Sequence, residues 1–120
     1  MKMKILHLPL KAKWYDMIER GEKPEEYREI KPYWEKRLID YKALKANYQA
    51  IALKRYMLGI WTDVCKAFPR GYTHVLLRCG YTKRTMLFGL DEIKMGKGNP
   101  DWGAPEEPEF IIKLGGRCNQ

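Results

Sequence analysis

The stretch that most constrains the fold is residues 21–28 (GEKPEEYR), where a helical pattern ends and a strand pattern begins. Its leading glycine tolerates the left-handed backbone that caps a helix C-terminus, so the preceding helix is expected to stop there. Its proline holds the residue before it in an extended conformation. A strand is therefore predicted over residues 25–30, in which alternation places Glu26 and Arg28 on the same face.

The charged side chains of this stretch have two interpretations. In the structural one, Glu26 and Arg28 form an exposed ion pair and Lys23 is solvated, an arrangement that contributes little to stability. In the functional one, the stretch lines a cleft, where Arg28 offers a planar guanidinium to a phosphate or a base edge and Lys23 adds a compact charge. Because a carboxylate repels phosphate, Glu26 would instead orient the two cations or accept a hydrogen bond from a base amino group.

Strand and helix patterns before and after this stretch indicate an α+β domain. Residues 3–8 predict a strand that ends at Pro9. Residues 10–20 predict a helix with Trp14 on its apolar face. Pro32 suits the first turn of a second helix, which is expected to continue to about residue 41.

The C-terminal half of the chain has strand patterns. Both alternate sets of side chains in residues 73–79 include apolar ones, which indicates a central strand. Residues 84–95 predict a long strand and residues 109–114 a last strand that closes the sheet. The Gly- and Pro-rich residues 96–105 predict a loop, and the chain from Gly115 onward is expected to fray.

Residues 42–70 are ambiguous, because their apolar spacing fits a helix while residues 48–53 also fit a strand. A helical insertion is the prediction we retain for this segment. The whole chain, residues 1–120, has the size of a single domain, and it is long enough to bury a core without support from disulfide bonds or metal ions.

The composition of the chain indicates which classes of binding partner are expected. The net charge of +8 and the pI of about 9.4 favour attraction to polyanions, although charge alone carries no sequence specificity. The three cysteines are far apart and no histidine pair has ligand spacing, so we expect no disulfide framework, metal site or cofactor. No apolar run approaches the roughly 20 residues of a membrane span, and no signal peptide is recognisable, so the expected location is cytoplasmic.

The spacing Gly-x-Lys-x-x-Glu-x-Arg, formed by Gly21, Lys23, Glu26 and Arg28, resembles the signature of the ASCH domain, a small member of the PUA-like superfamily. Residues 3–20 also look like that family, as do the motifs at residues 80–84, 96–98 and 102–104, whereas residues 42–70 lie outside the resemblance. The resemblance implies a PUA-like mixed β-barrel with helices at its rim. It implies less about function, since one fold hosts many functions.

ASCH domains are thought to hold RNA or a nucleotide-like ligand in a cleft beside the signature strand. The ligand-binding residues that this resemblance and the basic turn after residue 79 suggest are Gly21, Lys23, Glu26, Arg28, Tyr81, Lys83, Arg84 and Trp102. In this hypothesis Tyr81 is a stacking platform on the opposite lip of the cleft. Trp102 is either a second platform or a core residue beneath the Gly/Pro-rich loop, and His7 is expected to be half-buried.

Two other functions stay open. Some ASCH relatives are amidases for acylated cytidine that use a lysine and a threonine in the signature segment, and others are reported as ribonucleases. Here Lys23 is present but Glu26 replaces the threonine, so the two would act as an acid–base pair in a hydrolase rather than supply a hydroxyl nucleophile. The third hypothesis is a protein-interaction module built on residues 42–70. The sequence does not decide whether the chain is an enzyme, nor its oligomeric state.

Overall fold

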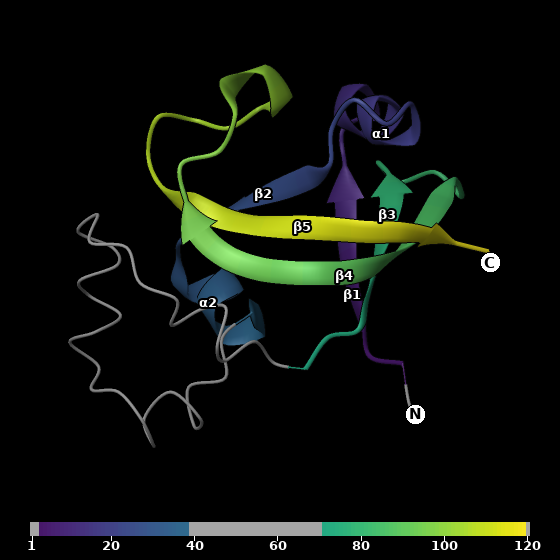
Figure 1. Cartoon of the computed structure of the whole chain (residues 1–120), viewed down its shortest axis with the longest axis horizontal. Helices are drawn as coiled ribbons and strands as arrows, with labels where there is room; N and C mark the ends of the chain where they lie inside the picture. Colours follow the sequence, from purple (N-terminus) through teal and green to yellow (C-terminus); the bar gives the residue numbers. More distant parts are fainter. Residues whose placement is uncertain (1–2, 39–70, 120) are drawn as a thin grey trace. The chain divides into compact units, whose positions relative to one another are not determined.

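The computed structural model describes residues 3–38 and 71–119, which form an α+β fold as predicted (Figure 1). The elements in chain order are β1 (Ile5–Leu10), α1 (Ala12–Glu19), β2 (Glu25–Glu29), α2 (Pro32–Leu38), β3 (His74–Cys79), β4 (Thr85–Gly96), the 3-10 helix η1 (Pro100–Trp102) and β5 (Glu109–Cys118). The predicted insertion at residues 42–70 lies outside the described residues. Neither helix in the described ranges has the length and apolar character of a membrane span.

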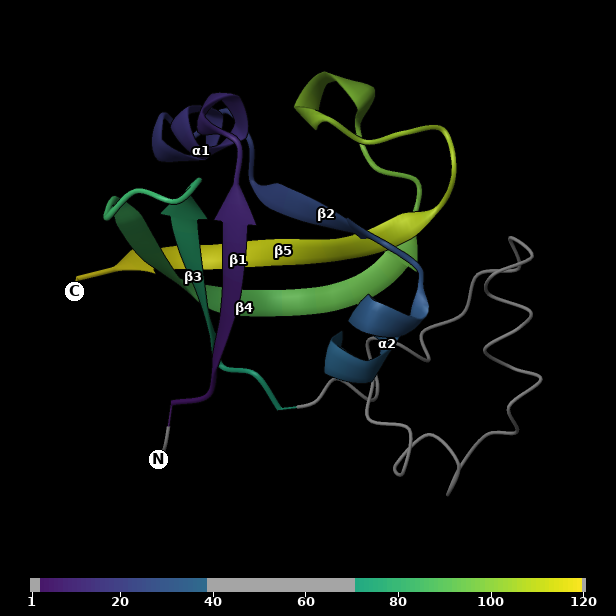
Figure 2. The same cartoon turned by 180° about the vertical axis from the view of Figure 1, so that it is seen from behind.

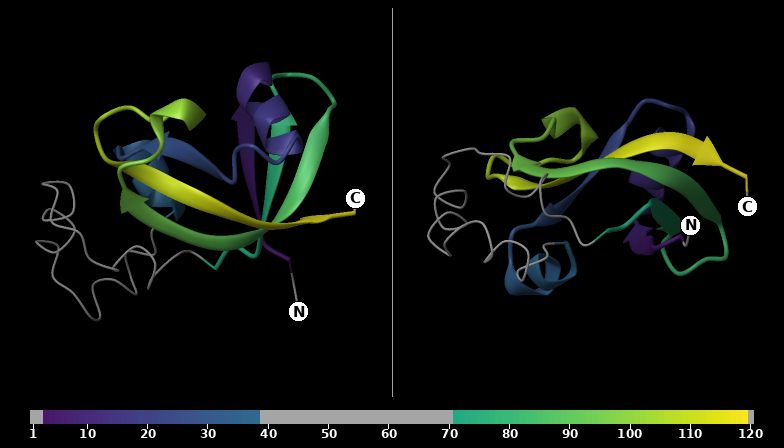
Figure 3. Two further views of the ribbon diagram at one scale, coloured as in Figure 1. Left: turned by 45° about the horizontal axis from the view of Figure 1, so that its top comes forward. Right: turned by 60° about the horizontal axis from the view of Figure 1, so that its bottom comes forward.

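The five strands of the described residues form one mixed sheet in the order β1-β3-β4-β5-β2. Strand β1 pairs in parallel with β3, and β3 pairs antiparallel with β4. Figure 2 shows β1 and β3 side by side, and β4 and β5 remain neighbours in the views of Figure 3. The position of β3 between two strands confirms that residues 73–79 form a central strand.

The described residues divide into two compact units. The first holds residues 3–26, 72–92 and 112–119, and the second holds residues 27–38, 71 and 93–111. Strands β2, β4 and β5 each contribute residues to both units, so every feature below is described within its own unit.

The core of the first unit follows from strand alternation and from one face of α1. The buried apolar side chains of β1 and β3 are Leu6, Leu8, Leu10, Val75, Leu77 and Cys79. From α1 the buried side chains are Tyr15 and Ile18, whereas Trp14 is only half-buried. The buried face of α1 is therefore turned relative to the predicted one: α1 contacts β3, and Tyr15 rather than Trp14 is buried.

Two predicted strand ends are wrong. Strand β1 continues through Pro9 to Leu10, which is possible because β1 lies at the edge of the described sheet, where a proline breaks no ladder of hydrogen bonds. Strand β5 continues to Cys118, so the chain does not fray from Gly115. There β5 passes close to β4, since a Cβ at Gly115 would lie 3.2 Å from the carbonyl oxygen of Gly89.

The core of the second unit includes a small cluster of Tyr27, Ala104 and Ile111, against which Trp102 packs. The loop after β4 is hydrogen-bonded to this cluster: the backbone N–H of Asn99 donates to the Tyr27 hydroxyl at 3.0 Å. Strand β4 includes Gly96, and the predicted loop follows it over residues 97–105, with the short helix η1 inside it.

Candidate functional site

The turn between α1 and β2 is built as its sequence predicts. Gly21 has a φ of +82°, in the left-handed region, and its N–H donates to the carbonyl of Ile18 at 3.0 Å. The N–H of Lys23 then donates to the carbonyl of Met17 at 3.2 Å. This bond holds the backbone of Lys23 against the last turns of α1, so the role of Gly21 here is to shape the turn that positions Lys23.

Lys23 and Glu26 form a buried ion pair. The Nζ atom of Lys23 lies 2.8 Å from Oε1 of Glu26, and the two side chains are only 1% and 6% exposed. Nζ also lies 5.0 Å from the ring centroid of Trp14, within the range of a cation–π contact. The structural interpretation that left Lys23 solvated is therefore wrong.

The burial of this pair is informative about its role. Removing two charges from water carries a desolvation penalty that their attraction offsets only with good geometry and further hydrogen bonds. The short contact between Lys23 and Glu26 meets the first condition, because a charge-assisted hydrogen bond is strong at this distance. A buried ion pair of this kind is therefore weak evidence of a contribution to stability.

Arg28 belongs to the second unit. Its Nη1 donates to the carbonyl of Tyr27 at 2.8 Å, and its guanidinium lies 5.3 Å from the ring centroid of Trp34. The side chain is half-buried. The structure thus brings Lys23 and Glu26 into contact and places the Arg28 guanidinium over an aromatic ring of α2.

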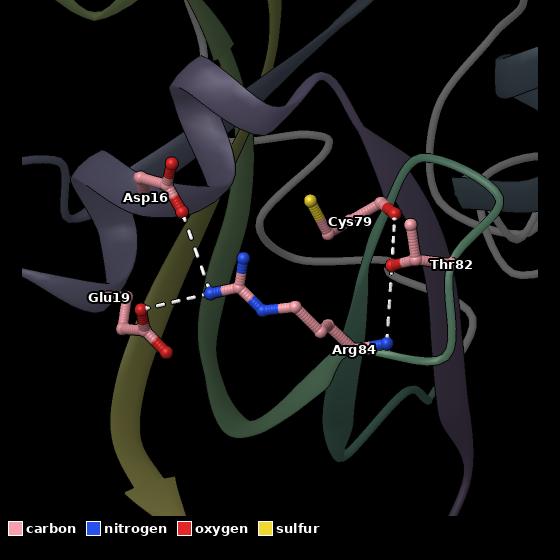
Figure 4. A network of polar contacts seen from close by, with 5 residues as sticks. All are labelled: Asp16, Glu19, Cys79, Thr82 and Arg84. Carbon is pink, nitrogen blue, oxygen red and sulfur yellow. Dashed lines mark hydrogen bonds and ion pairs between the residues drawn. The ribbon is translucent and has the colours of Figure 1, made fainter.

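The turn that joins β3 to β4 carries the other predicted cations. The hydroxyl of Thr82 donates to the carbonyl of Cys79 at 2.6 Å and accepts from the N–H of Arg84 at 3.2 Å (Figure 4). Gly80 has a φ of +56°. In this hydrogen-bonded turn Tyr81 is fully exposed and Lys83 is exposed.

Arg84 extends from this turn toward α1. Its Nη2 lies 3.2 Å from Oε1 of Glu19 and 3.6 Å from Oδ1 of Asp16, as Figure 4 shows. The guanidinium also lies 5.0 Å from the ring centroid of Tyr15. Burial raises the pKa of the Tyr15 phenol above its usual value, and the positive charge of Arg84 opposes that rise. Two carboxylates of α1 therefore already engage Arg84, a contact across 65 residues that local patterns do not show.

Replacing Arg84 with alanine should lower the free energy of unfolding by about 1 kcal/mol or less, because the ion pairs it loses are half-exposed. Urea unfolding at low and high salt measures this, and salt should shrink the difference. Lys83→Ala, an exposed cation of the same turn, is the control and should change stability by less than about 0.5 kcal/mol. Equal effects of the two substitutions would show that Arg84 does not tie the turn to α1.

The contacts of Trp102 bear on which of its two predicted roles it has. It lies half-buried against the cluster of Tyr27, Ala104 and Ile111, which favours the interpretation that it is a core residue beneath the loop.

The surface has hollows that the sequence did not indicate. One pocket of about 450 Å³ in the second unit is lined by Glu29, Ile30, Pro105, Glu107, Pro108 and Glu109. Its glutamates would repel a phosphate, so it is not suited to RNA. Another pocket, of about 260 Å³ in the first unit, is lined by residues of β1 and β3 and by the following turn, and it includes Tyr81. Neither lining contains Lys23, Glu26 or Arg28.

Within residues 3–38 and 71–119, no three His, Cys, Asp or Glu side chains are grouped in a way that could hold a metal ion. No family model matches this chain, and comparisons with curated proteins and with solved structures likewise gave no match.

Proposed function

We propose that this chain is an ASCH-type, PUA-like domain that binds single-stranded RNA or a nucleotide beside residues 21–28. The observation that carries the proposal is the buried pair of Lys23 and Glu26, 2.8 Å apart, at two signature positions. Replacing such pairs by apolar residues is often neutral or stabilising, so stability alone gives little reason to keep one. Departures of this kind from the ordinary rules of core composition are typical of functional sites.

The surroundings of the pair suit an anionic, aromatic ligand. Trp14 is half-buried, and its ring is contacted by Lys23 and by the exposed Lys13, whose Nζ lies 4.6 Å from the ring centroid. Base stacking on aromatic rings next to cations is the usual way in which proteins hold single strands. The net charge of +8 would bring a polyanion to this surface quickly.

Binding of a fluorescein-labelled oligouridylate, followed by anisotropy, tests the proposal. Lys23→Met combined with Glu26→Leu removes both charges while filling their space, and Arg28→Gln removes the third signature charge. Each variant should weaken binding at least about tenfold, the equivalent of one lost charge-assisted hydrogen bond. Affinity should also fall with salt, with a logarithmic slope of ~0.7 per phosphate neutralised.

The matched control is Arg20→Gln, which removes one charge from the same turn. Arg20 is exposed and already paired with Glu22 at 3.1 Å, so its loss should leave binding nearly unchanged. Thermal melting confirms first that each variant is folded. Wild-type affinity in both signature variants would refute the proposed site.

A hydrolase is the second candidate, favoured by the same 2.8 Å contact. Proton transfer requires partners within hydrogen-bond reach, and Glu26 would act as the base for water with Lys23 as its partner. Incubation of the pure protein with RNA and with acylated cytidine tests this activity. Turnover by Glu26→Gln equal to that of the wild type would exclude it.

A further inference from the structure

The outer face of β1 and β3, which points away from the core of the first unit, carries a pocket with an exposed arginine. Since alternate residues of β1 are buried, His7 and Pro9 lie on the other face, and His7 is exposed rather than half-buried as predicted. The parallel register sets His7 opposite Leu76 and Pro9 opposite Arg78. The chain then turns at Tyr81, and these residues line the pocket of about 260 Å³.

The groups in this pocket differ in kind from those around Arg84. Arg78 is exposed, and within residues 3–38 and 71–119 no carboxylate lies at ion-pair distance from it, whereas Arg84 contacts both Asp16 and Glu19. None of the described lining residues is acidic. Among the described residues nothing neutralises this guanidinium, so the pocket offers it to an anion.

The pocket also offers a stacking surface. The ring of Tyr81 is fully exposed at its rim, so packing of the core does not explain the position of this ring. Leu76 and Pro9 provide an apolar floor next to it. A tyrosine ring beside an apolar floor accepts the face of a planar base, and a guanidinium accepts a phosphate bidentately.

We infer that this pocket binds one nucleotide, with its base against Tyr81 and its phosphate on Arg78. The volume lies just below the range of about 300–1,000 Å³ that is usual for drug-sized ligands, which suits a single base better than a dinucleotide. His7 is a further hydrogen-bonding group on the pocket wall. The site uses no residue of the 21–28 segment, so it goes beyond the proposed function and does not depend on it.

Two-dimensional amide NMR with uridine 5′-monophosphate and with a short oligouridylate tests the inference. Both probes should shift the signals of Arg78, Gly80 and Tyr81, and the oligomer should bind more tightly if the natural source is an RNA strand. Tyr81→Ala should weaken binding at this site about tenfold, as expected for one lost stacking contact. Arg78→Gln should weaken it about as much, through loss of the phosphate contact.

Lys11→Gln is the matched control, since Lys11 is an exposed cation of the same unit but does not line the pocket. Because Tyr81 and Arg78 are exposed, their variants should keep the wild-type melting temperature. Unmoved signals with both probes, or wild-type affinity in both variants, would overturn the inference. Shifts at Arg78 and Tyr81 that persist in the Lys23→Met, Glu26→Leu variant support this site whether or not the 21–28 site binds RNA.

Discussion

Replacing Lys23 alone with methionine should lower the free energy of unfolding by about 3–5 kcal/mol, because the change leaves the buried carboxylate of Glu26 without the ammonium 2.8 Å away. Methionine keeps most of the volume and the apolar stem of lysine, so the loss would reflect charge rather than a cavity. Urea unfolding followed by circular dichroism measures the change. Few single substitutions have effects this large.

Two controls separate burial from simple loss of charge. Lys23→Met with Glu26→Leu removes both ions and should restore stability to the wild-type level or above. Lys31→Met removes a cation that is half-exposed and lies 3.6 Å from Glu29, so its effect should stay within about 1 kcal/mol. If Lys23→Met were as mild as Lys31→Met, the pair would be solvated in the molecule.

The sequence predicted the local structure around this pair but not its burial. The end of α1 at Glu19, shortly before Gly21, and the start of β2 at Glu25 follow from glycine and proline chemistry alone. The burial of Lys23 depends on a bond to the carbonyl of Met17 and on contact with Trp14, which bring the turn back against α1. Charge patterns along a strand do not carry that information, so the sequence left open whether Lys23 is solvated or lines a cleft.

Other differences have the same origin in long-range contacts. A proline ends a strand where its missing N–H would have to donate to a neighbouring strand. Strand β1 lies at the edge of the described sheet, so Pro9 can be part of it. The order of strands in the sheet could not be read from the sequence. In the sequence, Lys83 and Arg84 of the turn after β3 could not be distinguished from each other by role. Folding pairs Arg84 with α1, and it leaves Tyr81 on the rim of a pocket with Arg78.

The loop after β4 should be sensitive to substitution at Gly98, because Gly98 has no room for a side chain. A Cβ there would lie 2.6 Å from Cζ of Tyr27 and 2.7 Å from Cβ of Ala104, both in the packed cluster of the second unit. Gly98→Ala should therefore lower the free energy of unfolding by about 1–3 kcal/mol or more, as overpacking does. Urea unfolding measures the loss.

The same substitution should release the loop locally, because shifting the ring of Tyr27 breaks the 3.0 Å bond from the Asn99 N–H to its hydroxyl. Faster hydrogen exchange of the Asn99 amide would report this. Gly116→Ala is the matched control, since a Cβ at Gly116 meets nothing within 4 Å, and its effect should stay within about 0.5 kcal/mol. Equal losses at the two glycines would mean that the loop does not pack on this cluster, because only the close contacts with Tyr27 and Ala104 make Gly98 different from a glycine in open space.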